Sequence, residues 1–135
     1  MGDYKRVEVL LSNMEQYDKK FKKINPVGKV PAMKVIYDSK SEDFNMFESH
    51  AIMKYICGYR SLPDHWYPTS PNRDLKLQAR MDMYLDWHHA NLRMGAGGFL
   101  FRKYFSGLMD KNGVYSSKES VEESWKILNR SLQQI

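Results

Sequence analysis

The sequence predicts an α/β segment over residues 1–60 followed by an all-α segment over residues 75–135. In the first segment, short runs of alternating or β-branched apolar residues are separated by stretches with helical spacing, which is the pattern of mixed strands and helices. Residues 61–74 contain three prolines and little periodicity, and are predicted to form a linker. Beyond the linker the apolar residues recur only at helical spacing.

The first predicted element is a short strand over residues 6–11. Val7, Val9 and Leu11 occupy alternate positions there, which is the period of a strand with two different faces. Residues 13–23 follow as a weak helix or turn. The order of elements in this segment therefore begins with β and α.

A hairpin is predicted next, from a strand at residues 31–37 and a strand at residues 43–47. The residues between them are polar and have the composition of a hairpin loop. Pro31 has no N–H for a sheet ladder, so it belongs at the first residue of a strand, at an edge or at a bulge. The stretch alone leaves open whether the Val30–Pro31 bond is cis or trans.

A helix is expected directly after the hairpin, over residues 49–57. Ile52, Tyr55 and Ile56 recur at helical spacing, and Gly58 is expected to end the helix. Ser49 lies at its start, where unpaired N–H groups and the positive end of the helix dipole favour an anion. The Ser49 hydroxyl can either cap the helix or share a bound carboxylate with these N–H groups.

Two helices are predicted in the all-α segment. The first starts near Asp74 and runs past Arg93. The second opens with Ser116 and Glu119, which have the spacing of a capping box. Its apolar stripe comprises Val121, Trp125, Leu128, Leu132 and Ile135. The stripe is still apolar at the last residue, so the sequence is expected to stop inside an element and to leave apolar surface open to association.

Composition is typical of a globular protein, because 42% of the 135 residues are hydrophobic. Cys57 is the only cysteine, so no internal disulfide is expected. The formal net charge of +5 permits acidic ligands without selecting among them. The densest basic cluster is interpreted as a solvated helix face and comprises Lys19, Lys20, Lys22 and Lys23. Nucleic-acid binding would need exposed aromatics interleaved with basic residues, and is not predicted.

No apolar run approaches a membrane span, and the N-terminal residues have no apolar signal region. A cytoplasmic protein without membrane contact is therefore the expectation. Asp82, Asp86 and His89 share one helix face as a conceivable metal trio. Ordinary helix polarity is favoured because neither a fourth ligand nor an HExxH motif is present. For Gly95–Gly98, close helix packing or a helix break is favoured over a phosphate loop.

Four short words in the sequence resemble theta-class glutathione transferases, particularly those of the plant type. They are NPVGKVPA at 25–32, FESHAI at 47–52, DHWYP at 64–68 and DWHHANLR at 86–93. They occur in the same order as in the family, within a resemblance that spans residues 6 to about 105. The resemblance implies an incomplete thioredoxin-like domain over residues 1–60 and the first helices of the family's all-α domain.

The resemblance also implies a glutathione site. In the family the bond matching Val30–Pro31 is cis, and the backbone of the residue before the proline pairs with the cysteinyl part of glutathione. Glu48 and Ser49 match positions that hold the γ-glutamyl end. The full set of matching positions is Gln16, Lys29, Val30, Pro31, Glu48, Ser49 and Asp82.

Gln16 and Lys29 match positions near the glycine carboxylate of glutathione, where an amide donor and an ammonium are chemically suitable. Asp82 is expected to reach glutathione in a neighbouring subunit of a homodimer. Glutathione would be a co-substrate, no metal is implied, and the second substrate would be a small electrophile or a peroxide.

The family's catalytic serine has no counterpart in this sequence. It lies just after the family's first strand, whereas Met1 falls immediately before the second strand in this register. Ser12 lies at the end of that second strand and is not a substitute. The resemblance therefore implies a theta-class transferase truncated at both ends. The alternatives are an inert form that at most binds glutathione, or a chain that associates with partners through exposed helices.

Overall fold

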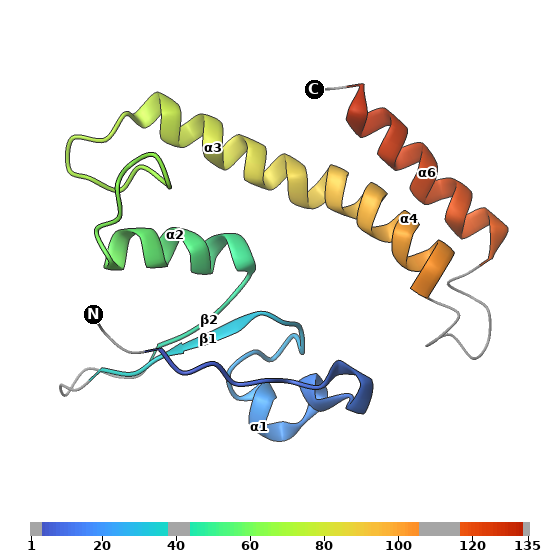
Figure 1. Ribbon diagram of the computed structural model, residues 1–135, viewed down its shortest axis with the longest axis horizontal. Coiled ribbons are helices and arrows are strands. Elements are labelled where there is room, and N and C mark those ends of the chain that lie inside the picture. Colours follow the sequence, from blue (N-terminus) through green and yellow to red (C-terminus); the bar gives the residue numbers. More distant parts are fainter. Residues whose placement is uncertain (1–3, 38–43, 106–116, 134–135) are drawn as a thin grey trace. The chain divides into compact units, whose positions relative to one another are not determined.

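The computed structural model describes residues 4–37, 44–105 and 117–133, and Figure 1 shows their elements in order. The chain divides into two compact units, residues 1–73 and 74–135. Among the described residues, no helix is both long enough and apolar enough to cross a membrane.

The first unit contains the predicted hairpin. Strand β1 (Ala32–Val35) pairs antiparallel with β2 (Phe44–Phe47), with Ala32 opposite Phe47 and Val35 opposite Phe44. Pro31 precedes the first ladder residue, so its missing N–H interrupts no ladder hydrogen bond, and the Val30–Pro31 bond is cis. The residues between the strands, 38–43, lie outside the described residues.

Helix α2 (Ser49–Tyr59) follows β2 with Glu48 as its N-cap residue. Gly58 does not end the helix as predicted, because the Arg60 amide still donates to the Ile56 carbonyl oxygen over 3.0 Å. The turn of positive φ comes later, at Ser61 with φ 48°. A glycine is compatible with a helical interior, so its presence alone does not mark the helix end.

The predicted strand over residues 6–11 is wrong. Residues 4–10 form irregular chain, and the two-stranded sheet of β1 and β2 is the only sheet in the described part of the molecule. Val7 remains 72% exposed. Alternating residues are suited to a strand, but the strand forms only if its N–H and C=O groups find a neighbouring strand.

The segment expected as a weak helix or turn consists of three short pieces. Two 3₁₀ turns, η1 (Leu11–Asn13) and η2 (Glu15–Tyr17), meet at Met14, which has φ 60°. A single helical turn, α1 (Lys19–Lys22), carries three of the four clustered lysines, and Lys23 is its C-cap residue. All four are exposed, as predicted for a solvated face.

In the second unit the predicted long helix is confirmed. Helix α3 (Leu75–Trp87) begins at Asp74, whose carboxylate accepts hydrogen bonds from the Lys76 and Leu77 amides at 2.8 and 3.2 Å. This capping satisfies two of the N–H groups that a helix start leaves unpaired. The chain then continues through three further helical segments, η3 (His88–Gly97, π-helical), α4 (Gly98–Leu100) and η4 (Phe101–Phe105, π-helical).

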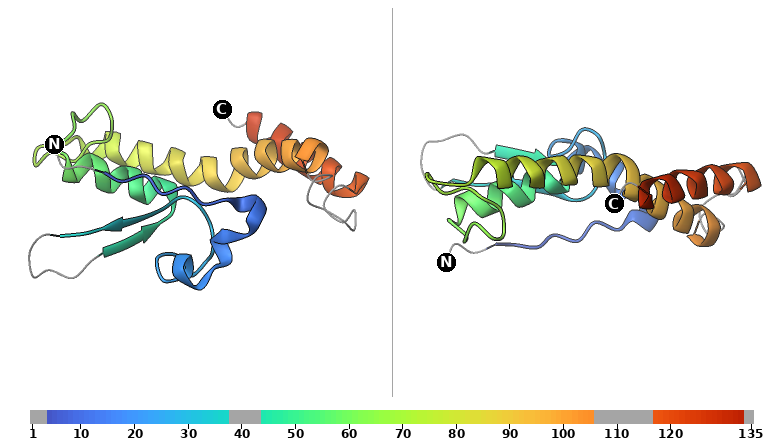
Figure 2. Two further views of the ribbon diagram at one scale, coloured as in Figure 1. Left: turned by 60° about the horizontal axis from the view of Figure 1, so that its bottom comes forward. Right: turned by 90° about the horizontal axis from the view of Figure 1, so that it is seen from above.

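Helix α6 (Lys118–Leu132) packs beside η3 and α4, as Figures 1 and 2 show. Its N-cap is Ser117, whose hydroxyl oxygen accepts from the Ser120 amide at 3.2 Å. The predicted capping box of Ser116 and Glu119 is therefore wrong by one position, since Glu119 is the second helical residue; Ser116 lies outside the described residues.

The buried face of α6 also differs from the predicted apolar stripe. Ser124 and Ser131 are the buried residues of this helix, at 0% and 1% exposure, while Trp125 and Leu132 are 47% and 55% exposed. Ile135, the last predicted stripe residue, lies outside the described residues. Ser124 faces α4, since a Cβ at Gly98 would lie 3.3 Å from its hydroxyl oxygen, and a small side chain suits such a close approach of two helices.

Candidate functional site

The hairpin register brings two of the predicted site segments to one end of the first unit. Ala32 and Phe47 are directly opposite each other, so the residues that precede β1 and those that follow β2 lie at the same end of the hairpin (Figure 1). At this end, Val30 and Pro31 precede β1, and Glu48 and Ser49 follow β2.

The start of α2 presents polar groups at this end. Glu48 has φ 71° and ψ 111°, and no side-chain hydrogen bond caps the helix. Ser49 is half-buried, and no partner for its hydroxyl occurs among the described residues. The Ser49 hydroxyl therefore does not act as the cap that the sequence allowed. Backbone N–H groups and the positive dipole end make such a helix start suitable for a carboxylate.

The loop before Val30 is held by the side chain of Asn25. Its Oδ1 accepts a hydrogen bond from the Val27 amide at 3.0 Å, and its Nδ2 donates to the Lys29 carbonyl oxygen at 2.7 Å. Gly28 has φ 69°, and a Cβ there would lie 2.9 Å from the Tyr17 ring and 3.1 Å from the Gln16 carbonyl oxygen. Both the conformation and the space require glycine at this position.

Gln16 therefore lies beside the same loop. Its side chain is buried, its Nε2 makes a long 3.8 Å contact with the Met14 sulfur, and its Oε1 has no hydrogen-bond partner within the described residues. The neighbouring Lys29 is exposed, and its ammonium forms no ion pair within the described part of the chain. A buried amide and an exposed ammonium thus flank the loop.

Asp82 lies on α3 in the second unit, where it is half-buried. The other six predicted site residues belong to the first unit. Among the described residues, no group of three or more His, Cys, Asp or Glu side chains could hold a metal ion, the Asp82, Asp86 and His89 combination included.

Asn25 is the residue that sequence reasoning overlooked. It lies within NPVGKVPA at 25–32 but is absent from the predicted site residues, although it is 1% exposed and forms two hydrogen bonds. The signal was available, because an asparagine followed by proline, with glycine three residues on, is typical of a turn that the asparagine side chain organises.

Known proteins match nearly the whole chain. Residues 2–58 match the family described as "Glutathione S-transferase, N-terminal domain". Glutathione S-transferase T3 of Arabidopsis thaliana is 38% identical over 130 residues, which are 96% of this chain and 20% of that protein. Glutathione S-transferase T1 of the same plant is 36% identical over 130 residues, 96% of this chain and 48% of that protein.

Solved structures of glutathione transferases also superpose on this chain. Human glutathione transferase theta-2, in complex with glutathione and an unknown ligand, superposes with a TM-score of 0.67 at 34% identity, covering 88% of this chain and 44% of that one. The W234R mutant of human glutathione S-transferase T1-1 superposes with a TM-score of 0.71 at 32% identity, covering 93% and 47%. The chain spans between a fifth and a half of the length of these relatives. Residues 2–58 therefore form a glutathione S-transferase N-terminal domain, and the relatives that the chain matches are of the theta class.

Proposed function

We propose that this chain forms the glutathione-holding part of a theta-class glutathione transferase. The family reaction joins the glutathione thiolate to an electrophilic carbon or reduces a peroxide. The proposed organisation is a thioredoxin-like glutathione-binding domain over residues 1–60, a linker over 61–74 and an all-α domain over 75–135. A cytoplasmic homodimer is the proposed assembly.

The hairpin register is the observation that carries this proposal. It brings the backbone of Val30 and the start of α2 to one end of the hairpin. We assign the cysteinyl part of glutathione to the backbone at Val30 and Pro31, and the γ-glutamyl carboxylate to Ser49 and the helix start beside Glu48. An extended peptide can pair with such a backbone edge, while a helix N-terminus stabilises its carboxylate.

The glycine carboxylate is assigned to Gln16 and Lys29. The closeness of Gln16 to Gly28 supports this assignment, because the backbone of Gln16 lies next to the residue that precedes Lys29. An ammonium and an amide donor are both suited to a carboxylate. Asp82 is assigned to glutathione in the neighbouring subunit of the homodimer.

A chain that binds glutathione without catalysis is the second candidate. None of the assigned contacts donates a hydrogen bond to the sulfur, and such a donor is what favours the thiolate in the family. The two candidates share the same binding site and differ only in whether the bound thiol reacts.

Calorimetric titration with glutathione tests the shared site. Ser49→Ala should weaken binding by about 1–2 kcal/mol, because the variant loses a hydrogen bond to a charged group. Ser12→Ala is the matched control, since Ser12 is an exposed serine of η1 in the same unit and its loss should leave the affinity unchanged. Equal affinity of the wild-type chain and Ser49→Ala would refute the assignment.

A further inference from the structure

The Asn25 side chain has both of its polar atoms committed to the loop that precedes Val30. The Val27 amide donates to Oδ1, and Nδ2 donates to the Lys29 carbonyl oxygen at 2.7 Å. Only this orientation of the amide pairs both groups, since the oxygen accepts and the NH₂ donates. At 1% exposure, the side chain has no competing water to take either bond.

The hydrogen bond to Lys29 has a consequence for the next residue. The carbonyl of Lys29 and the N–H of Val30 belong to one planar peptide unit, and in a trans unit they point in opposite directions. The Lys29–Val30 bond is trans, since Val30–Pro31 is the cis bond among the described residues. Holding the Lys29 carbonyl toward Asn25 therefore holds the Val30 N–H pointing away from Asn25.

The Val30 N–H is available for a ligand. No acceptor among the described residues takes a hydrogen bond from it, and Val30 itself is exposed. Pro31 cannot donate, so Val30 offers the last backbone donor before the β1 ladder begins at Ala32. A peptide carbonyl that accepts from the Val30 N–H must therefore approach from the side that faces away from Asn25.

We infer that Asn25 is a positioning residue that fixes the direction of the Val30 N–H toward a carbonyl of the cysteinyl part of glutathione. This inference rests on the proposed function and adds to it a residue that does not touch the ligand. Asn25 acts through the Lys29–Val30 peptide plane, and Ser49 at the start of α2 is independent of it.

Asn25→Asp isolates the proposed contact. The aspartate keeps the size of the side chain and an oxygen for the Val27 amide, but it replaces the Nδ2 donor with an oxygen that repels the Lys29 carbonyl. Asn45→Asp is the matched control, because Asn45 Nδ2 likewise donates to a lysine carbonyl, that of Lys23, at 3.2 Å in the same unit. Asn45 has no bond to the Lys29–Val30 peptide.

The experiment follows the Val30 and Ser49 amides by ¹⁵N NMR during titration with glutathione. Both resonances should shift saturably in the wild-type chain and in Asn45→Asp. In Asn25→Asp the dissociation constant should rise about tenfold, as for one lost hydrogen bond, and the Val30 shift at saturation should collapse while the Ser49 shift persists. A residue that only stabilises the fold would affect both amides alike.

Each other outcome decides against the inference. A dissociation constant within about twofold of wild type, with the Val30 shift unchanged, would refute the role of Asn25 alone. If Asn25→Asp loses the hairpin, Asn25→Ser is titrated instead, because its hydroxyl can still accept from the Val27 amide but is too short to reach Lys29. Loss of the hairpin in both variants would make Asn25 a folding residue. Absence of any saturable shift in the wild-type chain would instead overturn the proposed function.

Discussion

Gly95 of η3 lies directly against the backbone of Leu128 of α6. A Cβ at Gly95 would be 2.6 Å from the Leu128 amide nitrogen and 2.7 Å from its Cα. Close helix packing, one of the two predictions for the glycine-rich stretch, is thereby confirmed at this residue. The two helix backbones can approach this closely only where one of them lacks a side chain.

Gly95→Ala should therefore lower the free energy of unfolding by about 1–3 kcal/mol, because the helices must separate to admit the methyl group. Gly97→Ala is the matched control in the same helix. A Cβ there would meet only the flexible Arg93 side chain at 3.9 Å, so this variant should be neutral or more stable by up to about 1 kcal/mol. Urea unfolding followed by helical circular dichroism compares the two. Similar stabilities would contradict the close crossing.

Asp64 anchors the last segment of the first unit by accepting three hydrogen bonds. Ser70 donates through its hydroxyl at 2.6 Å and through its amide at 3.1 Å, and the Thr69 amide also donates at 3.1 Å. These donors, the Ser70 hydroxyl first, hold the pKa of the Asp64 carboxyl below its usual range. The folded state thus favours the carboxylate, so its stabilising effect is present above the unfolded-state pKa and is lost as the pH falls through the lowered folded-state pKa.

Ser70→Ala should raise the pKa of Asp64 toward its ordinary value, because the variant removes the hydroxyl that contributes most. Thr69→Ala is the control, since that variant keeps the backbone N–H that donates to Asp64. The pH dependence of the Asp64 carboxyl ¹³C shift measures both. An unchanged midpoint in Ser70→Ala would show that the hydroxyl bond is absent in solution.

Tyr37 and Tyr55 join the end of the hairpin to α2 through their hydroxyl oxygens, which lie 3.0 Å apart. The hydrogen bond with Tyr37, with smaller contributions from burial and from the neighbouring phenols, raises the pKa of Tyr55 from 10.0 to about 12. Because the folded-state pKa is raised, the associated stability is complete below the unfolded-state value and is lost as the pH rises through the folded-state value.

Tyr37→Phe should lower the pKa of Tyr55 toward the ordinary tyrosine value. At about pH 11, Tyr55 should then be mostly ionised in the variant and mostly neutral in the wild-type chain. Tyr59→Phe keeps the aromatic stacking on Tyr55, with centroids 5.7 Å apart, and should change the pKa little. Titration of ¹³Cζ-labelled tyrosine distinguishes the three proteins. Ionisation of Tyr55 near pH 10 in the wild-type chain would mean that the hydroxyl contact is broken.

Bound glutathione should keep a thiol pKa close to its value in solution, about 8.5 for a cysteine thiol, because none of the assigned contacts donates to the sulfur. Little thiolate would then be present at neutral pH, and conjugation of a reactive halide by residues 1–135 should scarcely exceed the background rate. Thiolate absorbance of the bound ligand and product formation measure this. Robust turnover that persists in Ser12→Ala would show that another residue activates the thiol, and turnover lost in that variant would identify Ser12.

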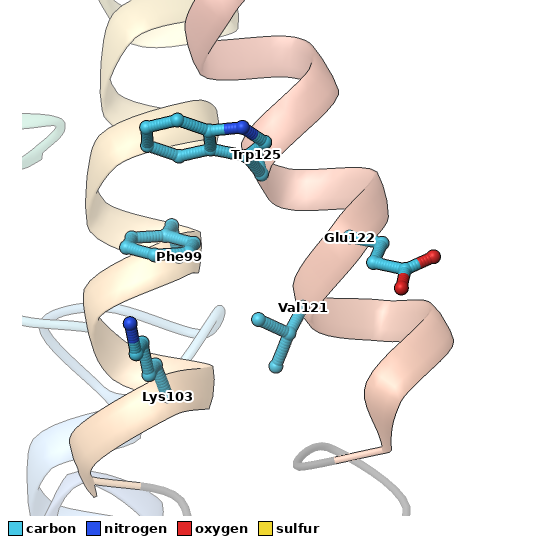
Figure 3. A pocket seen from close by; sticks show the side chains of 5 residues that line it. All are labelled: Phe99, Lys103, Val121, Glu122 and Trp125. Carbon is cyan, nitrogen blue, oxygen red and sulfur yellow. The ribbon is translucent and has the colours of Figure 1, made fainter.

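A groove lies between α6 and the segments α4 and η4 in the second unit. Figure 3 shows Phe99 and Trp125 side by side across the two helices, with ring centroids 5.1 Å apart, and the Lys103 ammonium lies 5.2 Å from the Phe99 ring. Val121 and Glu122 complete a groove of about 330 Å³. Two residues of the apolar stripe predicted from the sequence, Val121 and Trp125, thus line the groove.

Local patterns in the sequence were sufficient for the elements that depend on near neighbours. The hairpin, α2 and the start of the long helix at Asp74 follow from alternation, helical spacing and a capping carboxylate, all of which act within a few residues. The resemblance further supplied the predicted site residues. The hairpin register explains why four of them, from two segments separated in sequence, lie at one end of the hairpin.

Tertiary structure decided what depends on distant partners. Val7 and Val9 alternate like a strand, yet the segment stays irregular because ladder hydrogen bonds require a neighbouring strand that local sequence cannot specify. Ser124 is buried because the α6 backbone crosses close to the preceding helix, a distance that the helical spacing of α6 does not encode. The inferred role of Asn25 likewise depends on its hydrogen bond to the Lys29 carbonyl, whose direction is set only when the whole loop has folded.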